Sequence, residues 1–333
     1  MIGKTFRKMR AIICRNWCSP DDLCLADLPS PSLAPDQVRL RVNAVGINFA
    51  DTLMVAGKYQ VKPSFPFSPG LECSGEIVEM GPDVVGFKIG QRVMAISRFG
   101  GAYAEELITT HDYIVPIPDE MDFITAASFP VAYGTAHFSL THRGQLQAGE
   151  ILLVTGAAGG VGLAAIEVGK QLGAMVIAAA GSKEKLAIAK SHGADHLINY
   201  AKESICARVK EITNGSGFDV LFDPVGGGAF EQSLRATNWQ ARLLIVGFAG
   251  GRIQQVPANH VLVKNVSVIG VVWGAQAARE PIVVTRGLNQ LLTWWQAGRL
   301  KPHVAKTFPL EEAPAAMKAL LSRAYPGKII LTC

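Results

Sequence analysis

Cysteine is scarce in this sequence, and none of it is arranged for a structural metal or a disulfide framework. Six cysteines are spread over 333 residues, and no two of them have the C-x-x-C spacing of a zinc site. Cys14, Cys18 and Cys24 lie closest together, but no second cysteine pair or nearby histidine accompanies them. We therefore expect reduced thiols and no metal cluster.

Long apolar runs and dense charge are missing as well. No apolar run approaches the about 20 residues that span a bilayer, so no membrane partner is expected. The basic N-terminus lacks the apolar core of a signal peptide, which predicts a cytoplasmic protein. The formal net charge of +5 is weak and dispersed. It argues against a nucleic-acid partner, although it would favour an anionic cofactor.

What the chain does contain is apolar sequence, at 49% of its residues. This fraction suits a globular enzyme with large buried sheets, and the length favours two domains. The N-terminal part predicts short strands separated by turns, and Gln37–Val42 alternates as a half-exposed strand should. The strands expected here are Met9–Cys14, Gln37–Gly46, Ser74–Met80, Gln91–Ile96 and Tyr103–Thr109.

From Gly149 onward, strand-like apolar runs alternate with helical ones, which predicts a parallel sheet covered by helices. The expected strands are Ile151–Thr155, Met175–Ala180, His196–Ile198, Val220–Asp223, Arg242–Gly247 and Val266–Val272, with helices over Val161–Leu172 and Lys183–Lys190. A helix over Glu311–Ser322 and a last strand over Lys328–Thr332 are expected to rejoin the first domain.

The stretch Ile151–Leu163 predicts a phosphate-binding turn. A buried strand enters a glycine-rich turn, and the turn opens a helix whose N-terminus favours negative charge. Gly159 and Gly160 would let backbone N–H groups approach a pyrophosphate, and Gly162 would let the helix pack closely on the strand. The G-x-G-x-x-G pattern is imperfect, because Ala157 occupies the position of its first glycine. The turn is informative because it lies between a strand and a helix.

The residues after the next strand indicate which dinucleotide is bound. An NAD site usually offers an acidic residue there, whereas this strand ends in Ala180 and is followed by Ser182, Lys183 and Lys185. A 2′-phosphate would be favoured at this position, so NADPH is the expected cofactor. Two alternatives remain open: Ser182 simply caps the helix, or Glu184 serves NAD.

Five motifs occur in one order across nearly the whole chain, and together they are similar to the medium-chain dehydrogenase/reductase superfamily, in its zinc-free quinone oxidoreductase branch. The motifs are Asn48–Thr52, Ser68–Glu72, Tyr133–Thr135, Ala157–Gly162 and Asp223–Gly227. The resemblance implies an α/β fold with a GroES-like, mainly-β catalytic domain and a Rossmann nucleotide-binding domain with a doubly wound parallel sheet. The expected bounds are 1–130 and 276–333 for the first domain and 131–275 for the second.

The resemblance also implies that no zinc is bound. Asn48, Leu71 and Val131 match the positions of the Cys, His and Cys ligands in zinc-dependent relatives, and the tetracysteine loop after Gln91–Ile96 is missing. Without a Lewis acid, reduction of quinones or α,β-unsaturated carbonyls by NADPH is the expected reaction. Glu72 is expected to keep a structural or electrostatic task, and Cys73 to pack in the core.

The family pattern places further residues around the cofactor. Asn48 and Thr135 are expected at the nicotinamide ribose. The pyrophosphate is expected at Ala158, Gly159, Gly160 and Val161, and the 2′-phosphate at Gly181, Ser182, Lys185 and Tyr200. The nicotinamide cleft is expected to be lined by Phe248, Ala249 and Val272–Gly274, which includes Trp273 and Gly274. The basic residues Arg323 and Lys328 are expected to approach the cofactor or the active site.

No general acid is identified from the resemblance. Some relatives carry a tyrosine directly after the Asn48–Thr52 motif, and this chain has Leu53 at that position. Tyr59 is the nearest candidate for binding or protonating substrate, with packing as the alternative, and Asn48 could bind a carbonyl oxygen. An enoyl-thioester reductase and a non-catalytic NADPH-binding or structural protein are the other functions considered.

Three further features receive simpler interpretations. The apolar strand Val266–Val272 could pair with its twin, which predicts a homodimer. His192 and His196 are interpreted as part of a surface turn rather than a zinc pair. Cys333 is expected to be inert.

Overall fold

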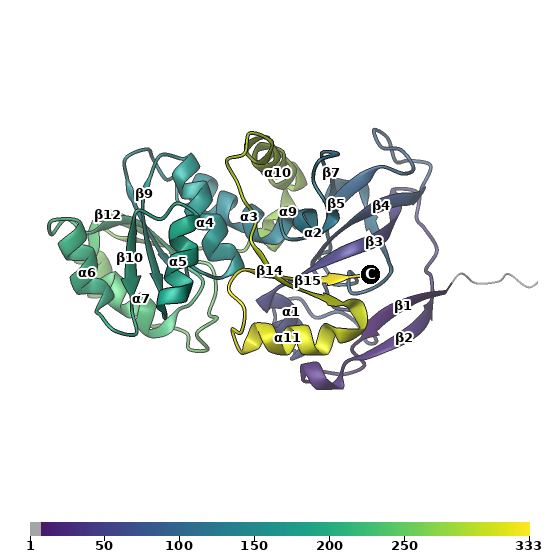
Figure 1. The fold of residues 1–333 in the computed structure, drawn as a ribbon, viewed down its shortest axis with the longest axis horizontal. Coiled ribbons are helices and arrows are strands. Elements are labelled where there is room, and N and C mark those ends of the chain that lie inside the picture. Colours follow the sequence, from purple (N-terminus) through teal and green to yellow (C-terminus); the bar gives the residue numbers. More distant parts are fainter. Residues whose placement is uncertain (1–7) are drawn as a thin grey trace, which may run out of the picture. The chain divides into compact units, whose positions relative to one another are not determined.

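The computed structural model describes residues 8–333, and the chain divides into two compact units. Unit 1 comprises the residues up to Val131, Gln276–Leu292 and Pro302–Cys333, and unit 2 comprises Ala132–Ala275 and Thr293–Lys301. The chain passes between the units at four points, three of which lie in helices that Figure 1 labels: α3 (Pro130–His137), α9 (Trp273–Arg279) and α10 (Pro281–Gln296). The fourth lies between Lys301 and Pro302.

Unit 1 is built mainly from β-strands. A hairpin of β1 (Lys8–Ile13) and β2 (Cys24–Pro29) accompanies a seven-stranded sheet in the order β14-β15-β3-β4-β5-β7, with β6 also pairing with β3. These strands are β3 (Gln37–Ile47), β4 (Glu72–Met80), β5 (Arg92–Ile96), β6 (Glu106–Thr110), β7 (Ile114–Pro116), β14 (Val304–Pro309) and β15 (Lys328–Thr332). The C-terminal strand β15 pairs with β3, as the sequence predicted for the tail.

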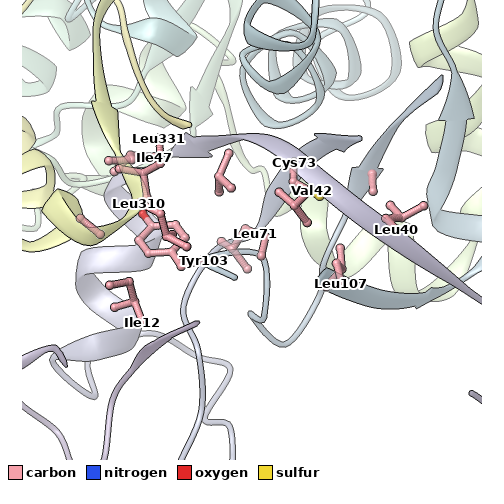
Figure 2. Close-up of a cluster of buried hydrophobic side chains, with 14 of the residues drawn as sticks. Ile12, Leu40, Val42, Ile47, Leu71, Cys73, Tyr103, Leu107, Leu310 and Leu331 are labelled. Carbon is pink, nitrogen blue, oxygen red and sulfur yellow. The ribbon is translucent and has the colours of Figure 1, made fainter. Parts of the chain in front are cut away.

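The core of unit 1 is formed by this sheet with two short helices, α1 (Phe49–Val55) and α11 (Ala313–Leu321). A third helix, α2 (Phe123–Ala127), packs in a separate small cluster with Ala44 and Ile330. Figure 2 shows its labelled members, among them Leu71, Cys73 and Tyr103. Cys73 is fully buried, and burial raises the pKa of its thiol. The packing role predicted for Cys73 is confirmed.

Unit 2 contains a parallel sheet in the order β10-β9-β8-β11-β12-β13. In chain order this is 3-2-1-4-5-6, the order of a Rossmann domain, so the predicted fold is confirmed. The strands are β8 (Ile151–Thr155), β9 (Met175–Ala180), β10 (His196–Asn199), β11 (Phe218–Asp223), β12 (Thr237–Ile245) and β13 (Ser267–Gly270). The helices are α4 (Gly160–Gln171), α5 (Lys183–Ser191), α6 (Ile205–Ile212), α7 (Gly227–Leu234) and α8 (Ala258–Val263).

The structure differs from the predicted elements mainly where segments are short. The sequence analysis did not predict β2, β7 or α1, because seven residues or fewer give little periodicity. The predicted strand Val266–Val272 shortens to β13, whose residues are mostly exposed. Within residues 8–333, no helix is long and apolar enough to cross a membrane.

Candidate functional site

A buried ion pair joins the last strand of the chain to the first residue of β4. The Nζ atom of Lys328 lies 2.6 Å from Oε1 of Glu72, and both side chains are less than 10% exposed. The two residues meet because β15 and β4 both pair with β3. The ammonium group also donates to Oδ1 of Asn48 at 2.9 Å and to the Ile47 carbonyl at 3.0 Å.

These contacts bear on the prediction that Lys328 approaches the cofactor or the active site. Its ammonium group has three hydrogens, and three protein acceptors surround it. The predicted approach to the cofactor would therefore break a bond in this cluster. As folded, Lys328 neutralises a carboxylate and orients Asn48.

Glu72 is fully buried, and both of its oxygens have partners. Oε1 accepts from Lys328 and from Nδ2 of Asn48 at 2.8 Å, and Oε2 accepts from the backbone N–H of Val131 at 2.7 Å. Gly46 makes room for this carboxylate, since a Cβ atom there would lie 2.3 Å from Oε1. The task predicted for Glu72 is thus a specific one: its buried carboxylate joins the residue before α1, the first turn of α3 and the strand β15.

Asn48 precedes α1, and both the nitrogen and the oxygen of its side-chain amide are hydrogen-bonded. Nδ2 donates to Glu72 and to the Gly46 carbonyl at 3.3 Å, while Oδ1 accepts from Lys328. With both amide hydrogens engaged, binding a substrate carbonyl through Asn48 would require one of these bonds to break.

The three positions that match zinc ligands do not fit a zinc ion. Leu71 packs in the core, Val131 offers its backbone N–H to Glu72, and Asn48 is bound to an ammonium group. A cation held by Asn48 repels a second cation. In the part of the chain that the structure describes, no group of three or more His, Cys, Asp or Glu side chains could hold a metal.

A second buried carboxylate lies beside this cluster. Oδ2 of Asp51 accepts from the backbone N–H of Asn48 at 2.7 Å and from the Tyr103 hydroxyl at 3.2 Å. Its Oδ1 is buried without a hydrogen-bond partner among residues 8–333. Burial raises the pKa of Asp51 to about 7, although Lys328 opposes the shift. The sequence showed Asp51 only as part of a motif and gave no sign of this titration.

Tyr59 follows α1 and packs against the core of unit 1. Burial raises the pKa of its phenol, and the charge of Asp51 adds to the shift. Its side chain is only partly buried, and among the described residues its hydroxyl has no hydrogen-bond partner. The hydroxyl is therefore a neutral donor that is free to meet a ligand.

The glycine turn of unit 2 connects β8 to α4. A Cβ atom on Gly162 would lie 2.3 Å from the Gly156 carbonyl oxygen, which confirms the close packing predicted for that glycine. Gly159 is exposed, but its backbone N–H donates to the Gly156 carbonyl at 2.9 Å, and the helix begins at Gly160. Ala158 is buried beneath them, and Val161 is partly exposed in the first helical turn.

Four residues expected at the 2′-phosphate lie together at the ends of β9 and β10. Ser182 caps α5, since its hydroxyl accepts from the Lys185 backbone N–H at 3.3 Å. The ring of Tyr200 lies over Gly181, where a Cβ atom would be 3.3 Å from it. The Lys185 ammonium group makes no hydrogen bond or ion pair within residues 8–333. The capping alternative for Ser182 is therefore correct, and Lys185 keeps a free charge beside it.

The remaining predicted residues of unit 2 differ in accessibility. Phe248 is 37% exposed, and the Ala249 backbone N–H bonds to the Pro224 carbonyl at 3.0 Å. Trp273 is only 5% exposed, because its ring packs on Gly134. Gly274 beside it is exposed, and the lining of the nicotinamide cleft by Val272–Gly274 stays a prediction.

The last two predicted cofactor residues, Thr135 and Arg323, differ in burial. Thr135 is buried, and its carbonyl accepts from the Ser139 hydroxyl at 2.6 Å. Arg323 follows α11 in unit 1, where it is exposed with a φ of 56°.

Sequence reasoning missed a buried polar cluster in unit 2. Glu167 of α4 accepts from the Tyr133 hydroxyl at 2.6 Å, lies 2.7 Å from Nδ1 of His192, and accepts from the Lys301 backbone N–H at 3.0 Å. The His192 side chain is 8% exposed. The interpretation of His192 as part of a surface turn is therefore wrong, because its ring enters the interior to meet Glu167.

Comparison with known proteins agrees with the two units. Residues 34–119 match the family model described as alcohol dehydrogenase GroES-like domain, and residues 160–286 match the one described as zinc-binding dehydrogenase. The second match contains none of the three positions that correspond to zinc ligands. The chain is thus built as a dehydrogenase or reductase with a GroES-like and a nucleotide-binding domain.

Similar proteins narrow this class. Quinone oxidoreductase-like protein 2 from Bos taurus is 42% identical over 327 residues, which cover 98% of this chain and 93% of the relative. Quinone oxidoreductase from Sus scrofa is 31% identical, with 92% of each chain covered. The crystal structure of Escherichia coli quinone oxidoreductase complexed with NADPH has a TM-score of 0.90 at 29% identity, covering 97% of this chain and 100% of that one. The chain belongs to the quinone oxidoreductase-like family of the medium-chain dehydrogenase/reductase superfamily.

Proposed function

We propose that this protein is a zinc-independent oxidoreductase that uses NADPH to reduce quinones or related α,β-unsaturated carbonyls. The observation that carries the proposal is the buried pair of Lys328 and Glu72, which lies among the positions where a zinc enzyme of this superfamily has its ligands. An ammonium group there is incompatible with a Lewis-acid metal. Acceptors that are already electron-poor need no such metal.

The proposed cofactor fits the residues of unit 2. The N-terminus of α4, which begins at Gly160, would hold the pyrophosphate, and the free ammonium group of Lys185 would meet a 2′-phosphate, with Tyr200 beside it. NADPH, when bound, supplies the hydride that reduces the acceptor. The NADPH complex of the Escherichia coli relative supports this choice.

In unit 1, we assign the acceptor's oxygen to Tyr59. Its phenol is neutral at physiological pH, since burial and Asp51 both raise its pKa, so it donates a hydrogen bond rather than accepting one. Asn48 is assigned to positioning, because its amide is fixed between Lys328 and Glu72. Tyr59→Phe should lower kcat/KM for quinones about tenfold or more, at an unchanged Kd for NADPH. An unchanged kcat/KM would remove Tyr59 from the site.

The test is NADPH oxidation with 1,4-benzoquinone and 9,10-phenanthrenequinone as acceptors, measured before and after dialysis against a chelator. We expect turnover that is insensitive to the chelator and to added zinc. Loss of turnover on dialysis, with recovery on adding zinc, would contradict metal independence. Inactivity across a broad panel of quinones and enones would contradict the substrate class, and turnover of CoA thioesters alone would favour an enoyl-thioester reductase. Micromolar NADPH binding without any turnover would favour the non-catalytic alternative.

We also propose a homodimer formed through β13. This strand is the last in its sheet, and Val268 on it is 39% exposed. Unpaired edge strands with exposed apolar residues favour pairing with a second copy. Light scattering should give twice the monomer mass for the wild-type chain and a smaller mass for Val268→Lys. A monomeric wild-type chain would refute the dimer.

A further inference from the structure

Two cysteines that the proposed reaction does not use face each other in unit 1. Cys14 and Cys18 flank the bend after β1, and their Sγ atoms are 3.7 Å apart. Cys14 exchanges backbone hydrogen bonds with Phe67, at 2.8 and 3.1 Å. Cys18 donates its backbone N–H to the Val55 carbonyl at the end of α1, at 3.0 Å. Because each cysteine is anchored to a different segment, the fold as a whole sets the short distance between the sulfurs.

At 3.7 Å the two sulfurs are in van der Waals contact. A disulfide has an S–S length of about 2.05 Å, so the sulfurs need to approach by roughly 1.7 Å, which side-chain rotation can supply. Among residues 8–333, no other pair of cysteine sulfurs is in contact. Cys24, the next cysteine in the chain, is exposed, and its Sγ lies 3.9 Å from the Ile13 carbonyl oxygen.

We propose that Cys14 and Cys18 form a dithiol site that closes reversibly to an intramolecular disulfide, with a small organic disulfide as the oxidant. Cys18 is partly exposed and attacks first, as the thiolate, which breaks the S–S bond of the reagent and releases one thiol. Cys14 then attacks the Cys18 sulfur, which forms the protein disulfide and releases the second thiol. The two protein thiols lose two electrons and two protons, and the reagent becomes two thiols.

The surroundings of the two sulfurs make this exchange slow near neutral pH. Burial raises the pKa of Cys14 to about 12, and Cys18 adds to that shift, while a hydrogen bond with the backbone of Asn16 opposes it. Burial also raises the pKa of Cys18, with Asp22 and Cys24 adding to the shift and Cys14 opposing it. The attacking species is the thiolate, so the rate should rise with pH.

Closure should be visible at Trp17, which lies between the two cysteines. Its ring packs on Gly57, where a Cβ atom would be 2.7 Å from it, and its centroid is 4.5 Å from that of Phe65. The side chain is 38% exposed, so its emission reports on solvent. Drawing the two ends of the bend together moves Trp17 relative to these partners.

The test treats the full chain with 2-hydroxyethyl disulfide at about pH 7 and about pH 9, alkylates free thiols, and maps the tryptic peptides. Trypsin cleaves at Arg15, between the two cysteines, and gives Ala11–Arg15 and Asn16–Arg39. We expect these peptides to stay linked until a reductant is added, with faster linkage at the higher pH. Alkylated Cys14 in a free Ala11–Arg15 peptide would overturn the proposal.

Cysteine variants identify which residue forms the disulfide with Cys18. Cys24→Ser should leave the linkage intact, whereas Cys14→Ser should abolish it and leave Cys18 as the mixed disulfide. The emission change on oxidation should be lost in Trp17→Phe. A disulfide between Cys18 and Cys24, found within Asn16–Arg39 of the wild-type chain, would assign the chemistry to another pair and refute this one.

Discussion

Lys328 and Glu72 are separated by 256 residues in the chain and by 2.6 Å between Nζ and Oε1 in the fold. Removing the lysine would leave a fully buried carboxylate without its counter-charge. Lys328→Met should therefore lower the free energy of unfolding by about 3–5 kcal/mol, measured by urea denaturation. Lys328→Met with Glu72→Gln should recover part of this loss, because the remaining side chain is then neutral.

The matched control for this substitution is Lys318→Met, which breaks an exposed pair with Asp21. Exposed pairs contribute about 1 kcal/mol or less, so the control should change stability little. Equal effects of the two single substitutions would show that burial does not set the strength of the Lys328 pair.

Asp51 should make stability depend on pH. Its pKa in the folded protein is about 7, above the ordinary 3.8, so the folded state binds this proton more tightly than the unfolded state. The stability gained is complete below the ordinary pKa and is lost as pH rises toward the folded pKa, by at most about 1.4 kcal/mol per pH unit. Asp51→Asn removes this loss, so its free energy of unfolding relative to wild type should rise between about pH 4 and 7.

The measurement is urea denaturation across that range, with Asp36→Asn at an exposed position as the control. A difference between Asp51→Asn and wild type that stays constant with pH would contradict the raised pKa.

Two glycines of the phosphate turn should separate stability from cofactor binding. A Cβ atom on Gly162 would meet the Gly156 carbonyl oxygen at 2.3 Å, so Gly162→Ala should cost roughly 1–3 kcal/mol of stability. Gly159 has a φ of −79° and open space, and its Cβ atom would lie 3.4 Å from the same oxygen. Gly159→Ala should leave stability unchanged and weaken NADPH binding, measured by calorimetry. Equal stability of the two variants would contradict this division.

Lys185 should distinguish NADPH from NADH. A charge-assisted bond to a phosphate contributes roughly 1.5–3 kcal/mol, so Lys185→Ala should raise the Kd for NADPH about tenfold or more. The Kd for NADH should stay the same, since that cofactor has no 2′-phosphate. Lys183→Ala, at the exposed neighbouring lysine, is the control. Unchanged NADPH affinity in Lys185→Ala would remove Lys185 from the cofactor site.

The elements with strong local patterns could be predicted from the sequence. The strand, glycine turn and helix of Ile151–Leu163 gave the Rossmann unit, and the alternation of Gln37–Val42 gave a strand of the mainly-β unit. Substitutions at single positions, such as Leu71 in place of a histidine, also indicated a lost metal. These sequence patterns are local, so they can be recognised without knowledge of the fold.

The contacts between distant segments could not be predicted. Lys328 was recognised as a basic residue near the site, but its partner Glu72 follows only when β15 and β4 are both known to pair with β3. The same holds for His192 and Glu167, which lie on different helices. Whether a charged side chain is buried depends on neighbours from the whole unit, so a short sequence pattern does not predict it.

Gly46 has a consequence for how such sequences can vary. Any side chain at this position would occupy the place of a Glu72 oxygen, and that oxygen is what Lys328 binds. A replacement at one of the three positions therefore disfavours the other two. We expect relatives to keep or lose Gly46, Glu72 and Lys328 as a set, which would make this trio a sequence signature of the buried ion pair.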